Sequence, residues 1–408
     1  MIRFGAAWIV PVDQPPIRDG WVAVDEGRIV AIGAGDGEAD RAYGPRRSLG
    51  RVALLPGLVN AHTHLELSWL RDRVPPASRF TSWVKQLMAV RRGVERPNDP
   101  IVVEAACAAA REARATGTIA VGDISNSLVS VDVIAASGLH GIVFHELIGF
   151  RAADAERVGA TRALREAAAS RVRCVRVSVA PHAPYSVSPE LFQAIRAEVS
   201  AGAVPYTSVH VGESDEEIEL MEAGTGEWAR MLRWIGAWRD DWAPPGVGPV
   251  EYLDRLGMID ARTLAVHGVR LADESLNCLR ARGATLVTCP RSNQWVGVGV
   301  PPVDRFYRSG VAVAVGTDSL ASVDDLNLFA ELKTLSWLAP GVPAARLLES
   351  ATLVGARALG LDSELGSLTP GKRAEIVAVS LPGEVADVEA YLVSGIEPRE
   401  IAWIPGAG

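Results

Sequence analysis

Several histidines stand where their side chains could share a metal ion. His62 and His64 follow an apolar run and are two residues apart, so on a strand both imidazoles point to one face. His210 and Asp318 lie at the ends of two later apolar runs. The predicted metal ligands are therefore His62, His64, His210 and Asp318. This nitrogen-rich set suits zinc, with Fe(II) as the alternative, and leaves one coordination position open for a catalytic water.

Acid and base groups are expected beside these ligands. Glu213 comes three residues after His210, where the chain leaves its strand, so its carboxylate can fold back over a water at the metal. The alternative for Glu213 is an ordinary surface glutamate, because an acidic run follows at residues 215–219. His267 can orient the attacking oxygen, and Asp318 can take its proton. The predicted catalytic residues are Glu213, His267 and Asp318.

A second metal ion is not expected. It would need a bridging group such as a carboxylated lysine at the end of a central strand, and Lys85, Lys333 and Lys372 are not placed in this way. The chain also contains no P-loop, G-x-S-x-G or G-x-G-x-x-G motif, so phosphate cradling and serine hydrolysis lack support. We therefore expect one divalent ion.

The elements that must position these residues form a repeating pattern. Apolar, β-rich runs alternate with helical stretches rich in Ala, Arg and Glu, which is typical of β/α units on a parallel sheet. Eight such units that close on themselves form an α/β fold, the (β/α)8 TIM barrel, whose catalytic groups lie at the carboxyl ends of the strands. The predicted strands cover residues 54–60, 119–123, 141–146, 175–180, 207–211, 263–267, 285–289 and 311–316.

Both ends of the chain carry shorter strands. The runs at residues 21–24, 28–32 and 374–379 are separated by glycine-containing turns, and the two ends could pair. A chain of 408 residues also exceeds the size at which a single core stops growing. The sequence predicts a small composite β-sandwich domain of residues 1–55 plus 362–408, beside a barrel domain of residues 56–361.

One segment interrupts the barrel pattern. Residues 219–249 contain Trp228, Trp234, Trp238 and Trp242. Exposing four tryptophans would be costly, so we expect them to pack. A helical hairpin with its own small core is favoured over a lid that covers the substrate.

Composition excludes several classes of partner. The 41 basic and 49 acidic residues give a net charge of −8 without a basic block, so nucleic acid is not expected. The four cysteines are far apart and form no C-x-x-C pair, which indicates a reducing compartment. Neither a leader-like N-terminus nor an 18-residue apolar run is found. We expect a cytoplasmic protein without a membrane partner.

Six motifs follow one another along the chain: Pro56 to His64, His210 to Ser214, His267-Gly268, Cys289 to Asn293, Gly316 to Ser319 and Pro370 to Glu375. In this order they resemble the amidohydrolase superfamily, specifically its mononuclear deaminase and chlorohydrolase branch. The resemblance covers nearly the whole chain. It implies a barrel with a composite β-sandwich, a divalent metal and hydrolytic release of a leaving group from a ring carbon.

Within that branch, the chain is most similar to the aminodeoxyfutalosine deaminases of menaquinone biosynthesis. The similarity lies in residues 64–68, Phe80 with Trp83, residues 123–126 and residues 145–149. Residues 66–71 lack the Met and the Leu-Leu-Arg-Gly-like run of the methylthioadenosine/S-adenosylhomocysteine deaminases. The resemblance therefore implies conversion of 6-amino-6-deoxyfutalosine to futalosine and ammonia.

The resemblance also implies roles for individual residues. Glu213 would protonate N1 of the adenine ring, and His182 would contact the purine. Glu66 would bind ribose hydroxyls, and Trp83 would stack. Glu146 is a further candidate for substrate binding. Both Glu66 and Glu146 lie just beyond a strand end, and a structural pairing with arginine is the alternative for each. A carboxylate on the substrate would pair with an arginine, for which Arg91, Arg151 and Arg291 are candidates. The resemblance further implies a homodimer.

Three alternatives remain open. The same site could deaminate another purine, such as methylthioadenosine, S-adenosylhomocysteine or guanine. It could also act as a chlorohydrolase or amine hydrolase on triazine-like rings. A metal-free scaffold protein is the remote alternative, and it would be expected to have lost the metal ligands, all of which are present here.

Overall fold

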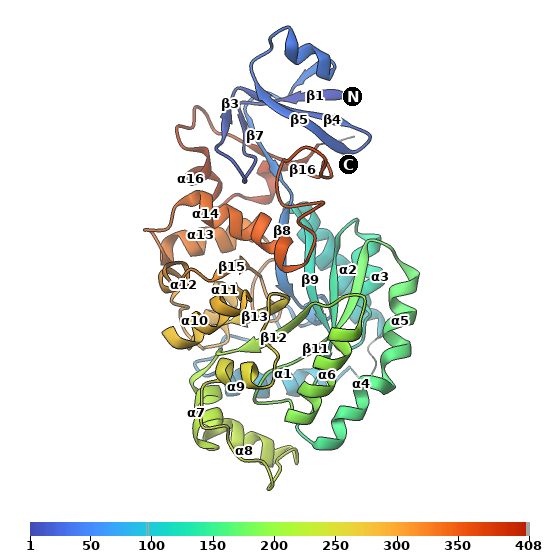
Figure 1. Ribbon diagram of the computed structural model, residues 1–408, viewed down its shortest axis with the longest axis vertical. Helices are drawn as coiled ribbons and strands as arrows, with labels where there is room; N and C mark the ends of the chain where they lie inside the picture. The colour runs from blue at the N-terminus through green and yellow to red at the C-terminus, as the bar shows by residue number, and fades with distance from the viewer. Residues whose placement is uncertain (95, 97, 405–408) are drawn as a thin grey trace.

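The chain folds into a β/α barrel with two further β-sheets at one end of the molecule (Figure 1). The computed structural model describes residues 1–94, 96 and 98–404. Within that part of the chain, no helix has both the length and the apolar character needed to cross a membrane.

The barrel consists of parallel strands, as the sequence predicted. Its interior is filled by apolar side chains such as Val59, Ile142 and Val266, all of which are fully buried. The barrel strands are β8 (Leu58–Thr63), β9 (Thr118–Ser125), β10 (His140–Leu147), β11 (Val175–Pro181), β12 (Thr207–Val211), β13 (Thr263–His267), β14 (Thr285–Thr288) and β15 (Ala312–Val315).

Two seams divide these strands into ladders of four, β11-β10-β9-β8 and β12-β13-β14-β15. At one seam, the His62 carbonyl accepts hydrogen bonds from the backbone N–H groups of Thr317 and Asp318, each at 3.1 Å. At the other seam, the backbone N–H of His210 donates to the His182 carbonyl at 2.9 Å. Residues of the candidate site therefore take part in closing the barrel at both seams.

The two terminal sheets pack face to face over one core that includes Phe4, Val22, Leu54 and Ile376. This confirms the predicted composite β-sandwich from both ends of the chain, whereas its exact boundaries stay a prediction. The first sheet orders β5 (Arg28–Ala34), β4 (Gly20–Asp25), β1 (Ile2–Gly5) and β6 (Arg46–Ser48), and the second orders β17 (Ile401–Trp403), β16 (Ile376–Ser380), β7 (Val52–Pro56), β2 (Trp8–Ile9) and β3 (Ile17–Arg18).

The first predicted barrel strand is two strands in the structure. Residues 54–60 read as one apolar run, but β7 ends at Pro56 in the sandwich and β8 begins at Leu58 in the barrel. A Cβ on the intervening Gly57 would lie 2.8 Å from the Ile119 side chain, so this close approach requires glycine. Periodicity missed the division because both strands are buried on both faces.

Helices surround the barrel, and several of them begin with a side-chain cap. In α6, Pro189 occupies the first turn and the Ser188 hydroxyl accepts from the Leu191 N–H. The helices are α1 (Phe80–Arg91), α2 (Pro100–Ala115), α3 (Ser130–Ala136), α4 (Glu156–Ala160), α5 (Arg162–Arg171), α6 (Pro189–Ala201), α7 (Asp215–Ala223), α8 (Gly226–Trp234), α9 (Pro249–Arg255), α10 (Asp273–Arg282), α11 (Pro290–Trp295), α12 (Val303–Ser309), α13 (Leu328–Leu338), α14 (Ala344–Glu349), α15 (Gly355–Ala358) and α16 (Val388–Leu392).

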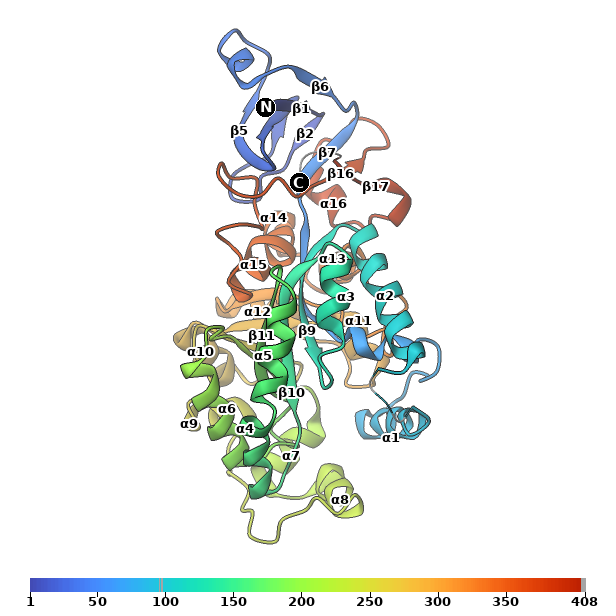
Figure 2. The same cartoon turned by 90° about the vertical axis from the view of Figure 1, so that its right-hand side faces the viewer.

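The tryptophan-rich segment contains α8, which lies at the opposite end of the molecule from the terminal sheets (Figures 1 and 2). Trp228 and Trp242 are buried and Trp238 is half-buried, as expected. The expectation is wrong for Trp234, whose exposed fraction is 64%. Trp234 ends α8 within a stretch, residues 233–236, that is exposed throughout.

Candidate metal centre and acid–base site

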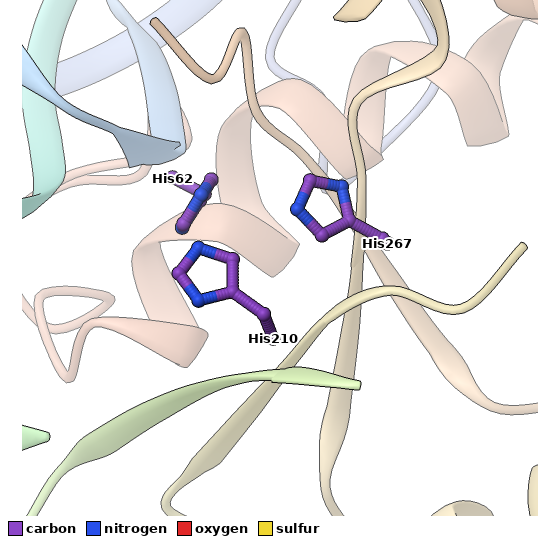
Figure 3. A group of neighbouring side chains, drawn as sticks. All are labelled: His62, His210 and His267. Atoms are coloured by element: carbon purple, nitrogen blue, oxygen red, sulfur yellow. The ribbon is translucent and has the colours of Figure 1, made fainter. Parts of the chain in front are cut away.

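Imidazoles from strands that are far apart in the sequence meet at the carboxyl ends of the barrel strands. His62 lies on β8, His210 on β12 and His267 at the end of β13, and Figure 3 shows their rings gathered together. The ring centroid of His62 lies 5.0 Å from that of His210 and 5.7 Å from that of His267. All three side chains are buried.

His64 and Asp318 complete a group whose spacing fits a tetrahedral ion. His64 Nε2 lies 3.4 Å from His210 Nε2 and 3.4 Å from Asp318 Oδ1, and His62 Nε2 lies 3.8 Å from the same oxygen. Tetrahedral ligands about 2.1 Å from an ion stand about 3.4 Å apart. Both ring nitrogens of His62 are buried without a hydrogen-bond partner among the described residues. These donors therefore fit one divalent cation.

Burial keeps these imidazoles neutral. Burial, followed by repulsion from His64, lowers the pKa of His62 well below its usual value. Burial also lowers the pKa of His64 to about 3 and that of His210 to about 4. A neutral imidazole is the form that coordinates a metal, so the group is ready to bind an ion without first losing protons at neutral pH.

Asp318 has one carboxylate oxygen fixed and one directed at the imidazoles. Its Oδ2 accepts hydrogen bonds from Ser292 Oγ at 2.5 Å and from Ser322 Oγ at 3.2 Å. Asp318 and His267 both have positive φ, 62° and 77°. A backbone conformation with positive φ costs a non-glycine residue about 1–3 kcal/mol of conformational free energy, and such residues are concentrated at functional sites.

Glu213 lies beside His267 instead of on the surface. Its side chain is buried, and its Oε1 is 3.6 Å from His267 Nε2. The Asn293 side-chain amide lies 3.0 Å from His267 Nδ1 and fixes the orientation of the ring. Burial, followed by the negative charge of Asp318, raises the pKa of Glu213 well above its usual value. A raised pKa favours the protonated form of this carboxyl group, which is the form that can donate a proton.

Glu217 holds the backbone of Glu213 in place. In the sequence, Glu217 looked like part of an acidic surface run, and this role was not predicted. Its side chain is fully buried, and its two oxygens accept from the backbone N–H of Gly212 at 3.0 Å and of Glu213 at 2.9 Å. A signal was present, because Ser214 and Glu217 have the S-x-x-E spacing of a capping box. Ser214 does cap α7 by accepting from the Glu217 N–H.

The structure brings three of the predicted substrate residues to the cavity beside this site. Trp83, Glu146 and His182 all line it. His182 Nδ1 contacts Ser186 Oγ at 2.5 Å, and burial lowers the pKa of His182 to about 4. His182 therefore faces a substrate as a neutral ring.

Glu66 and Arg291 do not line that cavity in the described part of the chain. Glu66 turns its carboxylate to the backbone and hydroxyl groups of residues 125–127. Arg291 pairs with Asp325 at 2.8 Å and lies 3.7 Å from buried Glu331. Arg151, an alternative to Arg291, donates to the Gly236 carbonyl at 2.7 Å, whereas Arg91 does line the cavity.

Aromatic side chains form one wall of the cavity. Tyr185 and Phe80 line it, and Trp228 of α8 packs behind them. The Tyr185 and Trp228 rings are stacked with centroids 4.1 Å apart. The tryptophan-rich segment therefore supports the wall of the candidate site in addition to its own packing.

A side chamber adjoins the cavity, and both share Leu67, Arg91 and Asn126 as lining residues. Trp69 and Arg96 also line the chamber, as does Glu66, whose carboxylate is held by residues 125–127. Two guanidinium groups beside an aromatic ring suit an anionic or conjugated substituent that extends from a molecule bound in the cavity.

Comparison with known proteins places these observations in context. The model of the Amidohydrolase family matches residues 53–401. The 5-methylthioadenosine/S-adenosylhomocysteine deaminase of Moorella thermoacetica is 30% identical over 94% of this chain and 88% of its own length. The 5′-deoxyadenosine deaminase of Methanothermobacter thermautotrophicus is 30% identical over 90% of this chain and 82% of its own.

Solved structures share the fold across almost the whole chain. The crystal structure of an adenosine deaminase from Xanthomonas campestris with bound zinc has a TM-score of 0.81 and 29% identity, and the match covers 98% of this chain and 90% of that one. The Helicobacter pylori aminofutalosine deaminase has a TM-score of 0.82 and 25% identity, over 96% of this chain and 94% of that one.

Proposed function

The chain belongs to the amidohydrolase family and is an aminohydrolase of that family, and we propose that it removes the 6-amino group of an adenine-type nucleoside by metal-dependent hydrolysis. The observation that carries this proposal is the convergence of neutral imidazoles, Asp318 and Glu213, whose pKa is raised, in one buried cavity. The names of the similar deaminases support a nucleoside as the substrate.

The metal is zinc in our proposal, with Fe(II) as the alternative for the same ligand set. The zinc in the similar Xanthomonas structure supports this choice. When bound, such an ion supplies a water whose pKa is lowered to about 7. The residues that would hold it are His62, His64, His210 and Asp318.

Glu213, His267 and Asp318 would move the protons of the reaction. Glu213 donates its proton to N1 of the adenine ring, which makes C6 open to attack. It then takes the proton of the new hydroxyl at C6 and helps to pass it to the amino group, which leaves as ammonia when the C6–N bond breaks. The proton that Asp318 has accepted finally restores Glu213. His267 orients the attacking oxygen, and Asp318 accepts its proton. Because the pKa of Glu213 is raised, its protonated donor form persists to a higher pH than that of an ordinary glutamate. A profile of kcat/KM should therefore fall as the pH rises through that raised pKa, and a rise over the same range would contradict the donor role.

The similar curated deaminases point to an adenine nucleoside that is altered at its 5′ position. Methylthioadenosine, S-adenosylhomocysteine and 5′-deoxyadenosine differ only in that substituent. In this proposal the cavity takes the adenine and the sugar, and the side chamber with Arg91 and Arg96 takes the substituent. The chamber favours a large or charged substituent over the bare methyl group of 5′-deoxyadenosine.

A second candidate is 6-amino-6-deoxyfutalosine. Its carboxylated aromatic ring matches the side chamber, where Trp69 lies with Arg91 and Arg96. The likeness to the Helicobacter enzyme also favours it. Deamination of this substrate would give futalosine and would place the enzyme in menaquinone biosynthesis.

Ammonia release from the zinc-loaded enzyme tests both candidates. The panel contains methylthioadenosine, S-adenosylhomocysteine, 5′-deoxyadenosine, aminodeoxyfutalosine and guanine, with Glu213→Gln as the inactive control. It also contains a chlorotriazine, for which chloride release is measured instead. We expect the highest kcat/KM with a 5′-substituted adenine nucleoside and a loss of about 10²–10⁴-fold in the variant. Turnover of guanine or the triazine alone would overturn the adenine proposal.

A further inference from the structure

Two side chains of the candidate site are held by consecutive residues of one short helix. Ser292 and Asn293 lie in the first turn of α11, and both are fully buried. The Ser292 hydroxyl donates to Asp318 Oδ2 at 2.5 Å. The Asn293 amide lies 3.0 Å from His267 Nδ1. The orientation of α11 therefore sets the positions of Asp318 and His267 together.

α11 begins without a side-chain cap of its own. Cys289 precedes the helix and makes no side-chain hydrogen bond to it, and Pro290 has no N–H to donate. The first backbone donor of the helix is therefore the N–H of Arg291. Glu331 of α13 supplies the acceptor, because its Oε2 accepts from this N–H at 3.3 Å. Glu331 thus caps α11 from a separate helix.

The side chain of Arg291 is fixed as well as its backbone. Its Nη1 and Nη2 donate to the two carboxylate oxygens of Asp325 at 2.8 and 3.2 Å. Its Nη1 also lies 3.7 Å from Glu331 Oε1. Arg291 is therefore held between two acidic side chains, immediately before the two residues that contact Asp318 and His267.

Glu331 is fully buried and does not line the cavity in the described part of the chain. Its Oε1 has no hydrogen-bond partner among the described residues. Burying a carboxyl group costs free energy that an apolar side chain at the same place would not cost. A carboxyl group kept here indicates a task that apolar packing cannot perform, and the hydrogen bond to Arg291 is that task.

We propose that Glu331 is a positioning residue, which caps α11 and thereby holds Asp318 and His267 in their reactive positions. This inference rests on the proposed function. Glu331 acts through Arg291 and the first turn of α11, so Arg291 serves the acid–base site instead of binding a substrate carboxylate. Removal of groups that orient metal ligands typically lowers metal affinity or activity by about 10–100-fold.

The test compares Glu331→Ala with Leu332→Ala, a variant of the next residue on the same helix. Leu332 is fully buried but packs in a separate apolar cluster with Leu328 and Leu335. Both variants should lower Tm. Only Glu331→Ala should lower kcat for ammonia release, by about 10–100-fold with unchanged KM, because Glu331 does not touch the substrate. It should also raise the Kd for zinc, measured by competition with a chelator, by about 10-fold.

Glu331→Gln is the conservative variant. Burial raises the pKa of Glu331 to about 8, which favours its neutral form at pH 7. Glutamine is neutral, has nearly the same shape and keeps an oxygen for the Arg291 N–H, so it should recover most of the kcat and zinc affinity. If Glu331→Ala does not fold, Asp325→Ala should show a smaller loss of the same kind, with the exposed Asp324→Ala as its control.

Two double variants trace the route from Glu331 to the metal centre. The hydroxyls of Ser292 and Ser322 both donate to Asp318 Oδ2, but only Ser292 belongs to α11. In a Ser292→Ala background, loss of Glu331 should weaken zinc binding little further, because the link through which it acts is already gone. In a Ser322→Ala background, the two effects on the zinc Kd should multiply.

Unchanged kcat and zinc affinity in Glu331→Ala would overturn the inference. An equal loss of kcat in Leu332→Ala, or no recovery in Glu331→Gln, would overturn it too. The proposed function can fail separately. If the wild type released ammonia from none of the nucleosides, the deaminase proposal would fall, whereas the zinc affinities of the variants would still decide whether Glu331 positions Asp318.

Discussion

The two halves of the cavity are built from different kinds of element. The metal half consists of His62, His64, His210 and Asp318 with the acid–base pair Glu213 and His267, all on or directly after barrel strands. The substrate half consists of Trp83 and Arg91 on α1, Asn126 in a turn and Glu146 near the end of β10. Backbone hydrogen bonds of the barrel fix the first half, whereas a surface helix and a turn carry most of the second.

This difference separates the chemistry from the choice of substrate. Strand ends keep their relative positions when surrounding loops change, and loops tolerate substitution. Proteins similar to this chain are named as deaminases of several adenine nucleosides, which agrees with a constant metal half and a variable substrate half. Substitutions in the two halves should therefore affect different kinetic constants.

The largest effect is expected in the metal half, from Asp318→Asn. The substitution keeps the side chain's shape but removes the negative charge that faces His62 and His64. We expect kcat/KM to fall by about 10³-fold or more, together with a lower zinc content measured by mass spectrometry. Full zinc occupancy with nearly normal turnover would show that the chemistry does not depend on this half as described.

An intermediate effect is expected from Glu217→Gln, which leaves every predicted ligand and proton donor in place. Glutamine can accept through one oxygen only, so one of the backbone N–H groups of Gly212 and Glu213 loses its partner. Misplacement of Glu213 should lower kcat by about 10–100-fold while KM stays unchanged. The control is Glu222→Gln, on the exposed side of the same helix. If both variants turn over substrate equally, Glu217 does not position Glu213.

The smallest effect is expected in the substrate half, from Arg91→Ala. Arg91 is exposed, so its pairing with a substrate carboxylate is worth about 1 kcal/mol or less. KM should rise about 3–5-fold for S-adenosylhomocysteine or aminodeoxyfutalosine, and it should not change for methylthioadenosine. The adjacent exposed Arg92→Ala serves as the control. A change in kcat for all substrates would contradict the prediction that Arg91 acts only in the substrate half.

The parts of the molecule that depend on regular periodicity could be predicted from the sequence. Buried parallel strands give apolar runs, and histidines or aspartate at their ends, such as His210 and Asp318, stand out against that background. Features that depend on a single contact could not be predicted from the sequence. The division at Gly57 and the pairing of Arg291 with Asp325 leave no periodic trace. In the sequence, Glu217 resembled a solvated acidic residue because it lies in a run of carboxylates, although its own side chain points into the core.

The seams of the barrel give the metal centre a second significance. His62 lies on β8 and His64 directly follows it, in one ladder of four strands. His210 lies on β12 and Asp318 follows β15, both in the other ladder. A cation held by all four residues would join the two four-stranded ladders at the carboxyl ends of their strands, as a reversible cross-link. Its binding free energy would then oppose opening of the barrel, since any ligand of the folded state stabilises that state. The temperature of unfolding would therefore measure the fraction of enzyme molecules that hold the ion, and this measurement needs no substrate.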